Sequence, residues 1–505
     1  MPKLYIFGIG GTGSRTIKSL AMLLASGVKT NYEIVPIIID PDKSAADVNR
    51  TVKILNNYSN IHNKINTSEK NTFFKNKVST LGSIINDKQG RVIADQYVIN
   101  LEGLQGDNFR NFINFSTLDA NNSDLTSLLF SEQNLDLNLE VGFKGNPNIG
   151  SVVLNSFTKS QTFQYFADSF EEDDRIFIIS SIFGGTGAAG FPLLLKNLRE
   201  GNIGGKHHQQ IKNAVIGAIS VLPYFKLNTD ENSVIDSHTF NSKAKSALHY
   251  YYKNISGNQA LNSMYYIGDN ADNLYKNSEG GQTQRNDAHF VELAAALSII
   301  DFANDENLYT TDGKAENPKY KEFGVKEDIN TLTFKHLHES TQFIVKQNLT
   351  KLFYFNLFCN DVLKDKLDQR FASDGTYRID SNFLNQTFYT SLTEFFKSFR
   401  VWLGELSRNQ VSFKPFIIDY LTDDETKEVT DIKYDNSNIY NLVNGVDAKN
   451  SGIFSKLMGS KNYDFYVQKL NEIDKNNSAN FTSIETKFVE LFSQGTEVLI
   501  KEKLF

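Results

Sequence analysis

Apolar and polar residues occur in blocks along the first 45 residues. An apolar run, Leu4–Phe7, ends on a group of glycines, and Thr16–Ala25 then repeats apolar residues at helical spacing. A second apolar run, Glu33–Ile39, closes on Asp40-Pro41-Asp42. Strand, glycine turn, helix and strand in this order predict a βαβ unit and therefore a parallel sheet.

The same pattern returns further along the chain. Arg175–Ser180 is a candidate strand, a glycine-rich turn follows at 184–190, and Phe191–Leu198 has helical spacing. Ala214–Leu222 and Met264–Ile267 predict two more strands. We therefore expect an α/β fold with a Rossmann-like, doubly wound parallel sheet over roughly the first 300 residues.

Beyond residue 310 the pattern changes to longer helical stretches and one strand. We expect a nucleotide-binding domain at 1–310, a central connecting helix at about 286–304, and a second, α-rich α+β domain at 311–505. A polar, Asn- and Ser-rich stretch at about 50–140 predicts a solvated insertion; the alternative is a partner-binding surface. The expected elements of the second domain are helices at Phe334–Leu367, Phe383–Leu406 and Ser483–Leu504 and a strand at Val411–Tyr420.

Composition narrows the class of protein. The 505 residues exceed the usual size of one hydrophobic core, which predicts two or three domains. A net charge of −7 argues against non-specific nucleic-acid binding. The single cysteine, Cys359, excludes an internal disulfide and a cysteine-based zinc site. No stretch approaches the roughly 18 apolar residues of a membrane span, and the apolar start is too short for a signal peptide, so we expect a cytoplasmic chain.

Three glycine-rich turns carry the candidate chemistry. The first, Gly8-Ile9-Gly10-Gly11-Thr12-Gly13, lies between a strand and a helix and fits the dinucleotide-binding pattern, in which Asp40 would hold a ribose. The second, at 184–190, offers backbone donors suited to a di- or triphosphate but lacks the lysine of a P-loop. The third, at 145–150, reads Gly-Asn-Pro-Asn-Ile-Gly and by itself is typical of a plain turn.

Together these turns resemble the tubulin/FtsZ superfamily of filament-forming GTPases. That family surrounds GTP with a glycine-rich first loop, an acidic loop after the second strand, a G-N-P-x-x-G loop and a G-G-T-G signature. All four occur here in that order, at Gly8–Gly13, Asp40–Asp42, Gly145–Gly150 and Gly184–Gly187. The resemblance covers roughly the first 300 residues. It departs from the family at Ala188-Ala189 and at Ser14-Arg15, and the stretch 43–144 is longer than in FtsZ.

The resemblance implies a role for each loop. Gly10, Gly11, Thr12 and Gly13 would meet the α- and β-phosphates, and Gly184, Gly185, Thr186 and Gly187 would cradle the diphosphate of GTP or GDP. Gly145 and Asn146 would lie near the γ-phosphate, and Asp42 near Mg²⁺, through water. Pro223–Phe225 resembles the sugar-facing loop, whose carboxylate would be Asp230 or Glu231.

The resemblance also implies roles for the central helix. Asn286 and His289 would lie near the base; alternatively, Asn286 is a helix cap and His289 a surface residue. Ile299–Asp305 echoes the catalytic loop of FtsZ, so that Asp301 and Asp305 would polarise water across a subunit contact. The alternative is that the two carboxylates only end the helix.

We therefore expect a cytoplasmic tubulin-like GTPase that binds GTP and Mg²⁺ and self-associates head to tail as a filament. A nucleotide-binding scaffold or switch in a hetero-complex, with little or no hydrolysis, is the second hypothesis; its partner would bind the 50–140 stretch or the C-terminal domain. An NAD-dependent oxidoreductase that uses Gly8–Gly13 is the third, and it leaves the other two glycine turns unexplained.

Overall fold

A six-stranded parallel sheet forms the centre of the N-terminal part. Its strand order in the computed structural model is β12-β8-β6-β3-β1-β2. The structure describes residues 1–505 except 43, 66–67, 90–95, 100, 102–103, 105–106, 140–141, 144, 156, 228–239, 270–273, 276–280, 282–284, 323–328, 450–462 and 478–479. All neighbouring strands are parallel. The strands are β1 (Lys3–Ile9), β2 (Glu33–Ile39), β3 (Arg175–Ser181), β6 (Val215–Val221), β8 (Ser263–Ile267) and β12 (Lys319–Glu322).

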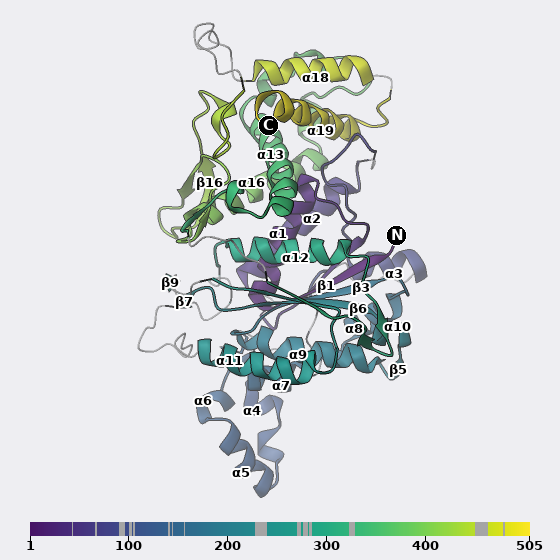
Figure 1. Cartoon of the computed structure of the whole chain (residues 1–505), viewed down its shortest axis with the longest axis vertical. Coiled ribbons are helices and arrows are strands. Elements are labelled where there is room, and N and C mark those ends of the chain that lie inside the picture. Colours follow the sequence, from purple (N-terminus) through teal and green to yellow (C-terminus); the bar gives the residue numbers. More distant parts are fainter. Residues whose placement is uncertain are drawn as a thin grey trace.

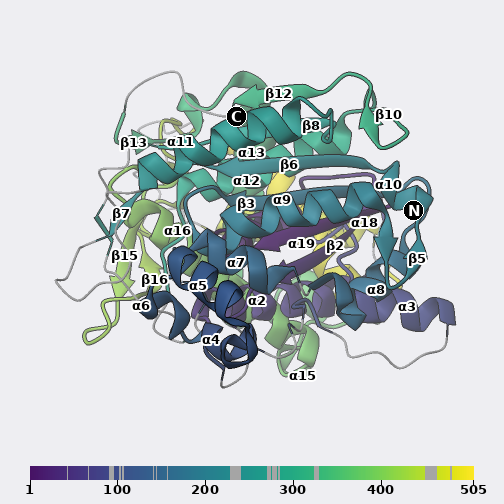
Figure 2. The same ribbon diagram turned by 90° about the horizontal axis from the view of Figure 1, so that it is seen from below.

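Helices cover both faces of this sheet, as the crossovers between parallel strands require. On one face lie α1 (Gly10–Ser26) and α12 (Phe290–Asn304), and on the other lie α7 (Pro147–Leu154), α9 (Gly185–Glu200) and α11 (Phe240–Tyr251). Figure 2 shows α7 and α9 side by side over the second face. The predicted doubly wound α/β architecture is confirmed.

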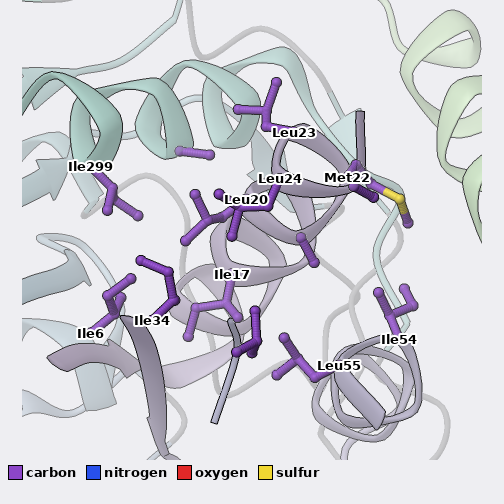
Figure 3. Close-up of a cluster of buried hydrophobic side chains, with 14 of the residues drawn as sticks. Ile6, Ile17, Leu20, Met22, Leu23, Leu24, Ile34, Ile54, Leu55 and Ile299 are labelled. Atoms are coloured by element: carbon purple, nitrogen blue, oxygen red, sulfur yellow. The ribbon is translucent and has the colours of Figure 1, made fainter. Parts of the chain in front are cut away.

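Helix α1, which follows β1, forms the middle of the core. Every residue of α1 except Gly11 is buried. In Figure 3 its leucines lie between the strand residues Ile6 and Ile34, Ile299 of α12, and Ile54 and Leu55 of α2 (Ala46–His62). Apolar contacts on all sides explain why a helix next to the sheet can be buried around its whole circumference.

The C-terminal part packs directly on α1 and α2 (Figure 1). Its main helices are α13 (Glu339–Asp361), α16 (Thr387–Arg408), α18 (Asp464–Asn477) and α19 (Ile484–Lys503). Rings such as Phe355 and Phe492, stacked with centroids 4.6 Å apart, fill its interior. The buried Trp402 of α16 donates from Nε1 to Ser19 Oγ of α1 at 3.2 Å, so that the two parts share a core.

Three local expectations differ from the structure. The single strand predicted at Val411–Tyr420 is wrong: β14 (Ser412–Phe413) and β15 (Asp419–Thr422) flank Pro415, which lacks the N–H that a continuous ladder needs. Helix α12 begins after His289, so that Asn286 precedes the helix and does not cap it. The sheet also includes β12, beyond residue 310; its alternating half-buried and exposed residues fit an edge strand, which needs no apolar run.

The stretch 50–140 contains two different kinds of structure. Helix α2 is part of the core, with Tyr58 fully buried. The short helices α4 (Phe109–Phe112), α5 (Ala120–Leu129) and α6 (Glu132–Leu135) lie together below α7 and α11 in Figure 1, and no residue of α5 is buried. The predicted solvated insertion therefore fits α5, whereas α2 at the start of the stretch belongs to the core.

Candidate functional site

The three glycine turns meet at the carboxyl edge of the sheet. A Cβ at Gly10 would lie 3.5 Å from Cβ of Thr186, which places the first turn against the 184–187 turn. A Cβ at Gly185 would lie 3.1 Å from the backbone nitrogens of both Gly145 and Asn146. The first turn, more than 130 residues before the other two in the sequence, therefore lies together with them at one site.

Helices α1, α7 and α9 all begin at this site. None of the three has a side-chain cap on its first turn, and none carries an acidic residue there. Some other helices have such caps, for example Asp119 on α5, Ser160 on α8 (Gln161–Ser169) and Ser483 on α19, whereas α2, α13 and α16 also lack them. Uncapped N-terminal N–H groups and the positive ends of three helix dipoles favour an anion at the point where they meet.

Glycine is required at two positions of the first turn for different reasons. Gly10 has φ +72°, a left-handed conformation that costs little only for glycine. A Cβ on Gly13 would lie 2.7 Å from Cα of Gly8, so α1 could not approach the end of β1 with a larger residue there. These are the two functions of glycine in a turn that brings a helix N-terminus close to a ligand.

Asp40 and Asp42 follow β2 at the same edge, and both are buried. Asp42 N–H donates to Asp40 Oδ1 at 3.0 Å, and burial raises the pKa of the Asp40 carboxyl to about 7. Asp42 accepts from Ser44 Oγ at 2.7 Å and from the N–H of Gly281 at 2.6 Å. Both carboxylate oxygens of Asp42 therefore already accept hydrogen bonds.

A buried ionic network lies directly behind the first turn. Arg15 of α1 contacts Asp47 of α2 at 2.6 Å and also pairs with Glu292 of α12. Tyr224 connects the same groups, because its hydroxyl accepts from Arg15 Nη2 at 2.9 Å and donates to Glu292 Oε1 at 2.8 Å. Asn286 donates to Asp47 from its backbone and its side chain, both at 3.2 Å. These two hydrogen bonds place Asn286 beside Asp47, in the ionic network behind the first turn.

The network continues into the C-terminal part through Glu405 of α16. This carboxylate lies 3.1 Å from Lys18 Nζ and pairs with Arg50. Burial alone would raise the pKa of Glu405, but the two cations lower it to about 2. The network holds three cations and three carboxylates, of which all but the half-buried Arg50 are buried: Arg15, Lys18, Arg50, Asp47, Glu292 and Glu405.

His289 is the N-cap of α12 and is buried, in contrast to the surface position considered for it. Val291 N–H donates to its Nδ1 at 3.1 Å, while His289 N–H donates to Glu292 Oε2 at 3.0 Å. Burial and the neighbouring Arg15 lower the pKa of His289 to about 3, so the ring is neutral near pH 7. The His289 ring lies 5.0 Å from that of Tyr224, between centroids.

Asp301 and Asp305 lie at the opposite edge of the sheet from the glycine turns. Arg175, the first residue of β3, donates to the carbonyls of Phe302 and Asp305 at 2.9 and 2.8 Å. Asp301 accepts from Tyr265 at 2.5 Å and pairs with Lys321, and Asp305 pairs with Lys319 at 2.6 Å. The structure therefore does not bring these carboxylates to the three turns of their own chain.

Sequence reasoning missed several residues that define the site. Glu292 carries a signal that could have been used, since it is a charge near the start of an otherwise apolar helix, whereas Arg15 and Asp47 stand among other polar residues of their helices. Lys243 of α11 donates from Nζ to the Gly145 carbonyl at 3.0 Å and carried no recognisable motif. The sugar-facing candidates Asp230 and Glu231 lie outside the described residues.

Among the described residues, no helix has the length and apolar character that crossing a bilayer requires. Nor does any group of three or more histidine, cysteine, aspartate or glutamate side chains in this part of the chain form a metal-binding cluster.

No protein-family model matches the sequence, and no curated protein matches it. Solved structures similar to it include CetZ from Methanosaeta thermophila strain DSM 6194, at 13% identity and a TM-score of 0.27, covering 60% of this chain and 51% of that one. A GTPγS-form protofilament of TubZ from Bacillus thuringiensis serovar israelensis matches at 12% identity and a TM-score of 0.22, covering 53% of this chain and 46% of that one. This chain thus spans about half the length of these structures. At such TM-scores the matches do not indicate what this chain binds.

Proposed function

We propose that this chain is a tubulin-like nucleotide-binding protein that binds GTP with Mg²⁺ and assembles head to tail into filaments. The observation that carries the proposal is the meeting of three uncapped, glycine-lined helix N-termini at one edge of a parallel sheet. A di- or triphosphate is the ligand whose several charged groups would use three such N-termini at once.

The order of the loops along the chain supports guanine nucleotide over other phosphates, because it is the order of the tubulin/FtsZ superfamily. Lys243 supports a triphosphate, since its ammonium group lies beside the Gly145 carbonyl at the rim of the site. Mg²⁺ would arrive with the phosphates and keep part of its water shell, as this ion does in nucleotide sites. Asp42, whose oxygens already accept hydrogen bonds, would act on it through water.

Hydrolysis belongs to the same proposal and depends on assembly. Asp301 and Asp305 lie at the edge of the sheet opposite the glycine turns, so they would reach the γ-phosphate only of a neighbouring subunit. Contacts that join two different faces of a subunit propagate into filaments. On this proposal the residues of one chain bind and orient GTP, and those of the next chain orient the attacking water.

The direct test is the nucleotide bound by the purified protein. Chromatography of the heat-released ligand should find GTP or GDP, and calorimetry with Mg²⁺ should show GTP binding much tighter than ATP. Thr186→Arg should abolish binding without unfolding, because the long side chain fills the space where the second turn meets the first; Thr186→Ser is the matched control that should still bind.

Two other results would redirect the proposal. Released NAD would favour the oxidoreductase hypothesis, and wild-type affinity in Thr186→Arg would show that the three turns do not form the site. Sedimentation with GTP and then with GDP separates a filament, which pellets with GTP, from a scaffold that binds nucleotide without pelleting.

A further inference from the structure

A second cavity lies in the C-terminal part, between α13, α15 (Ser381–Leu384) and α16. Its volume is about 500 Å³, within the range of pockets that hold small organic molecules. It shares no residue with the glycine-lined site or with the ionic network behind it. All of its lining residues belong to the described part of the chain.

The cavity carries positive charge only. Lys364 and Arg400 line it, and no aspartate or glutamate does. Asp431 neutralises Arg400 through contacts of 2.6 and 3.2 Å, whereas Lys364 forms no ion pair with any described residue. In a chain whose net charge is −7, a pocket lined in this way favours an anionic ligand.

Asn356 supplies a hydrogen-bond donor that has no partner. The residue is fully buried, lines the cavity, and accepts from Arg400 Nη1 through its Oδ1 at 2.8 Å. Because a guanidinium can only donate, this contact fixes the orientation of the amide and leaves Nδ2 as the remaining donor. That Nδ2 is buried and, among the described residues, has no acceptor. Leaving a buried amide donor unpaired is unfavourable, and an acceptor on a ligand would remove that cost.

The other walls favour an organic molecule over an inorganic ion. Tyr389 and Phe396 line the cavity, and both are buried, so the space beside the donor is partly aromatic. Asn356 and Asn360 lie four residues apart on α13, and Lys364 follows one turn later, in the 3-10 helix Leu363–Lys366, so that all three reach the same side. We propose that this pocket binds a small organic carboxylate, whose oxygens accept from Asn356 Nδ2 and lie near the Lys364 ammonium group.

Cys359 provides a reporter within the pocket. It is the only cysteine of the chain, it lines the cavity, and burial raises the pKa of its thiol. Iodoacetate and iodoacetamide alkylate a thiol by the same reaction, in which the sulfur forms a bond to carbon, iodide leaves, and the thiol proton goes to solvent. They are nearly equal in size and differ in that only iodoacetate is a carboxylate. The comparison of the two reagents therefore measures recognition of the carboxylate.

The experiment follows alkylation of Cys359 in the full-length protein by intact-mass spectrometry, with N-acetylcysteine as the reference for intrinsic reactivity. We expect the rate with iodoacetate to saturate as its concentration rises, and the ratio of iodoacetate to iodoacetamide rates to exceed the reference ratio by about tenfold or more. Iodoacetamide should show a linear dependence.

Variants separate the pocket from general reactivity. Lys364→Gln should return the ratio toward the reference and remove saturation, and Asn356→Leu should weaken saturation. Lys366→Gln, in the same 3-10 helix but outside the lining, is the matched control and should behave as wild type. Because Lys364 is exposed, its variant should fold even if Asn356→Leu does not. A linear rate with iodoacetate, an unchanged ratio in Lys364→Gln, or a Cys359 that neither reagent reaches would each overturn the proposal.

Discussion

Nη1 of Arg15 lies 2.6 Å from Oδ2 of Asp47, with both side chains buried. This contact joins the first turns of α1, which begins at the glycine site, to α2, and Glu292 and Glu405 extend it to α12 and α16. The charges of the network balance, three positive against three negative, which is what allows them to remain in the interior. The position of the first glycine turn therefore depends on groups from both parts of the chain.

We expect Arg15→Met to destabilise the protein by about 3–5 kcal/mol, because it leaves Asp47 and Glu292 buried without their shared cation. Chemical denaturation monitored by circular dichroism measures the free energy of unfolding. Lys53→Gln on α2 is the control, since Lys53 and Glu394 are both solvent-exposed and such a pair contributes about 0–1 kcal/mol. Equal losses in the two variants would contradict a special role for the network.

Gly10→Val should abolish GTP binding and lower the melting temperature. Valine is strained at φ +72°, by about 1–3 kcal/mol, and its branched side chain would point at Thr186. Gly205→Val is the matched control: Gly205 has φ +76°, and a Cβ there would meet nothing within 4 Å. It should lose comparable stability but keep calorimetric GTP binding. Loss of binding in both variants would attribute the effect to strain alone.

Asp40 should make the protein less stable as the pH rises from about 4 to 7. Its pKa is raised to about 7 in the folded chain, so over this range the unfolded chain releases a proton that the folded chain keeps. Above pH 7 the accumulated loss would be on the order of 4 kcal/mol, and below the unfolded pKa it would vanish.

Asp40→Asn tests this effect, because the amide imitates the protonated carboxyl and can still accept from Asp42 N–H. Thermal melts should show the variant more stable than wild type at pH 8 and equal to it near pH 4. An equal difference at both pH values would show that folding does not raise the pKa of Asp40.

The sequence predicted the sheet well because local signals determine it. Five of its six strands, among them Glu33–Ile39, coincide with apolar runs, and the three glycine turns needed only their order to be associated. The contacts between turns, such as Gly185 with Asn146, could be expected only through the resemblance.

The rest could not be predicted because it depends on tertiary partners. Arg15 and Lys18 look like solvated charges inside the apolar helix, and only the approach of Asp47 and Glu405 from distant segments makes their burial possible. Likewise, β12 has no apolar run, and it joins the sheet because β8 leaves an edge available to it.

Hydrolysis, if shared between subunits, should depend on protein concentration. We expect GTP turnover per molecule to rise with concentration, because Asp301 and Asp305 lie at the edge of the sheet opposite the glycine turns and reach a γ-phosphate only after association. Asp301→Asn with Asp305→Asn should keep GTP binding and assembly but lower turnover by about 10²–10⁴-fold, as expected for loss of a general base. Phosphate release measured over a hundredfold concentration range, with sedimentation in parallel, separates turnover from assembly.

The control for this variant is Asp312→Asn, on the exposed turn between β10 (Thr310–Thr311) and β11 (Lys314–Ala315), which should turn over GTP at the wild-type rate. Both catalytic candidates already pair with lysines of β12, so the double variant also frees Lys319 and Lys321. If those lysines held the carboxylates away from catalysis, Lys319→Gln with Lys321→Gln would raise GTP turnover. If the carboxylates only end α12, neither the aspartate nor the lysine substitutions would change turnover. Turnover that stays flat with concentration would exclude a shared site and favour the scaffold hypothesis.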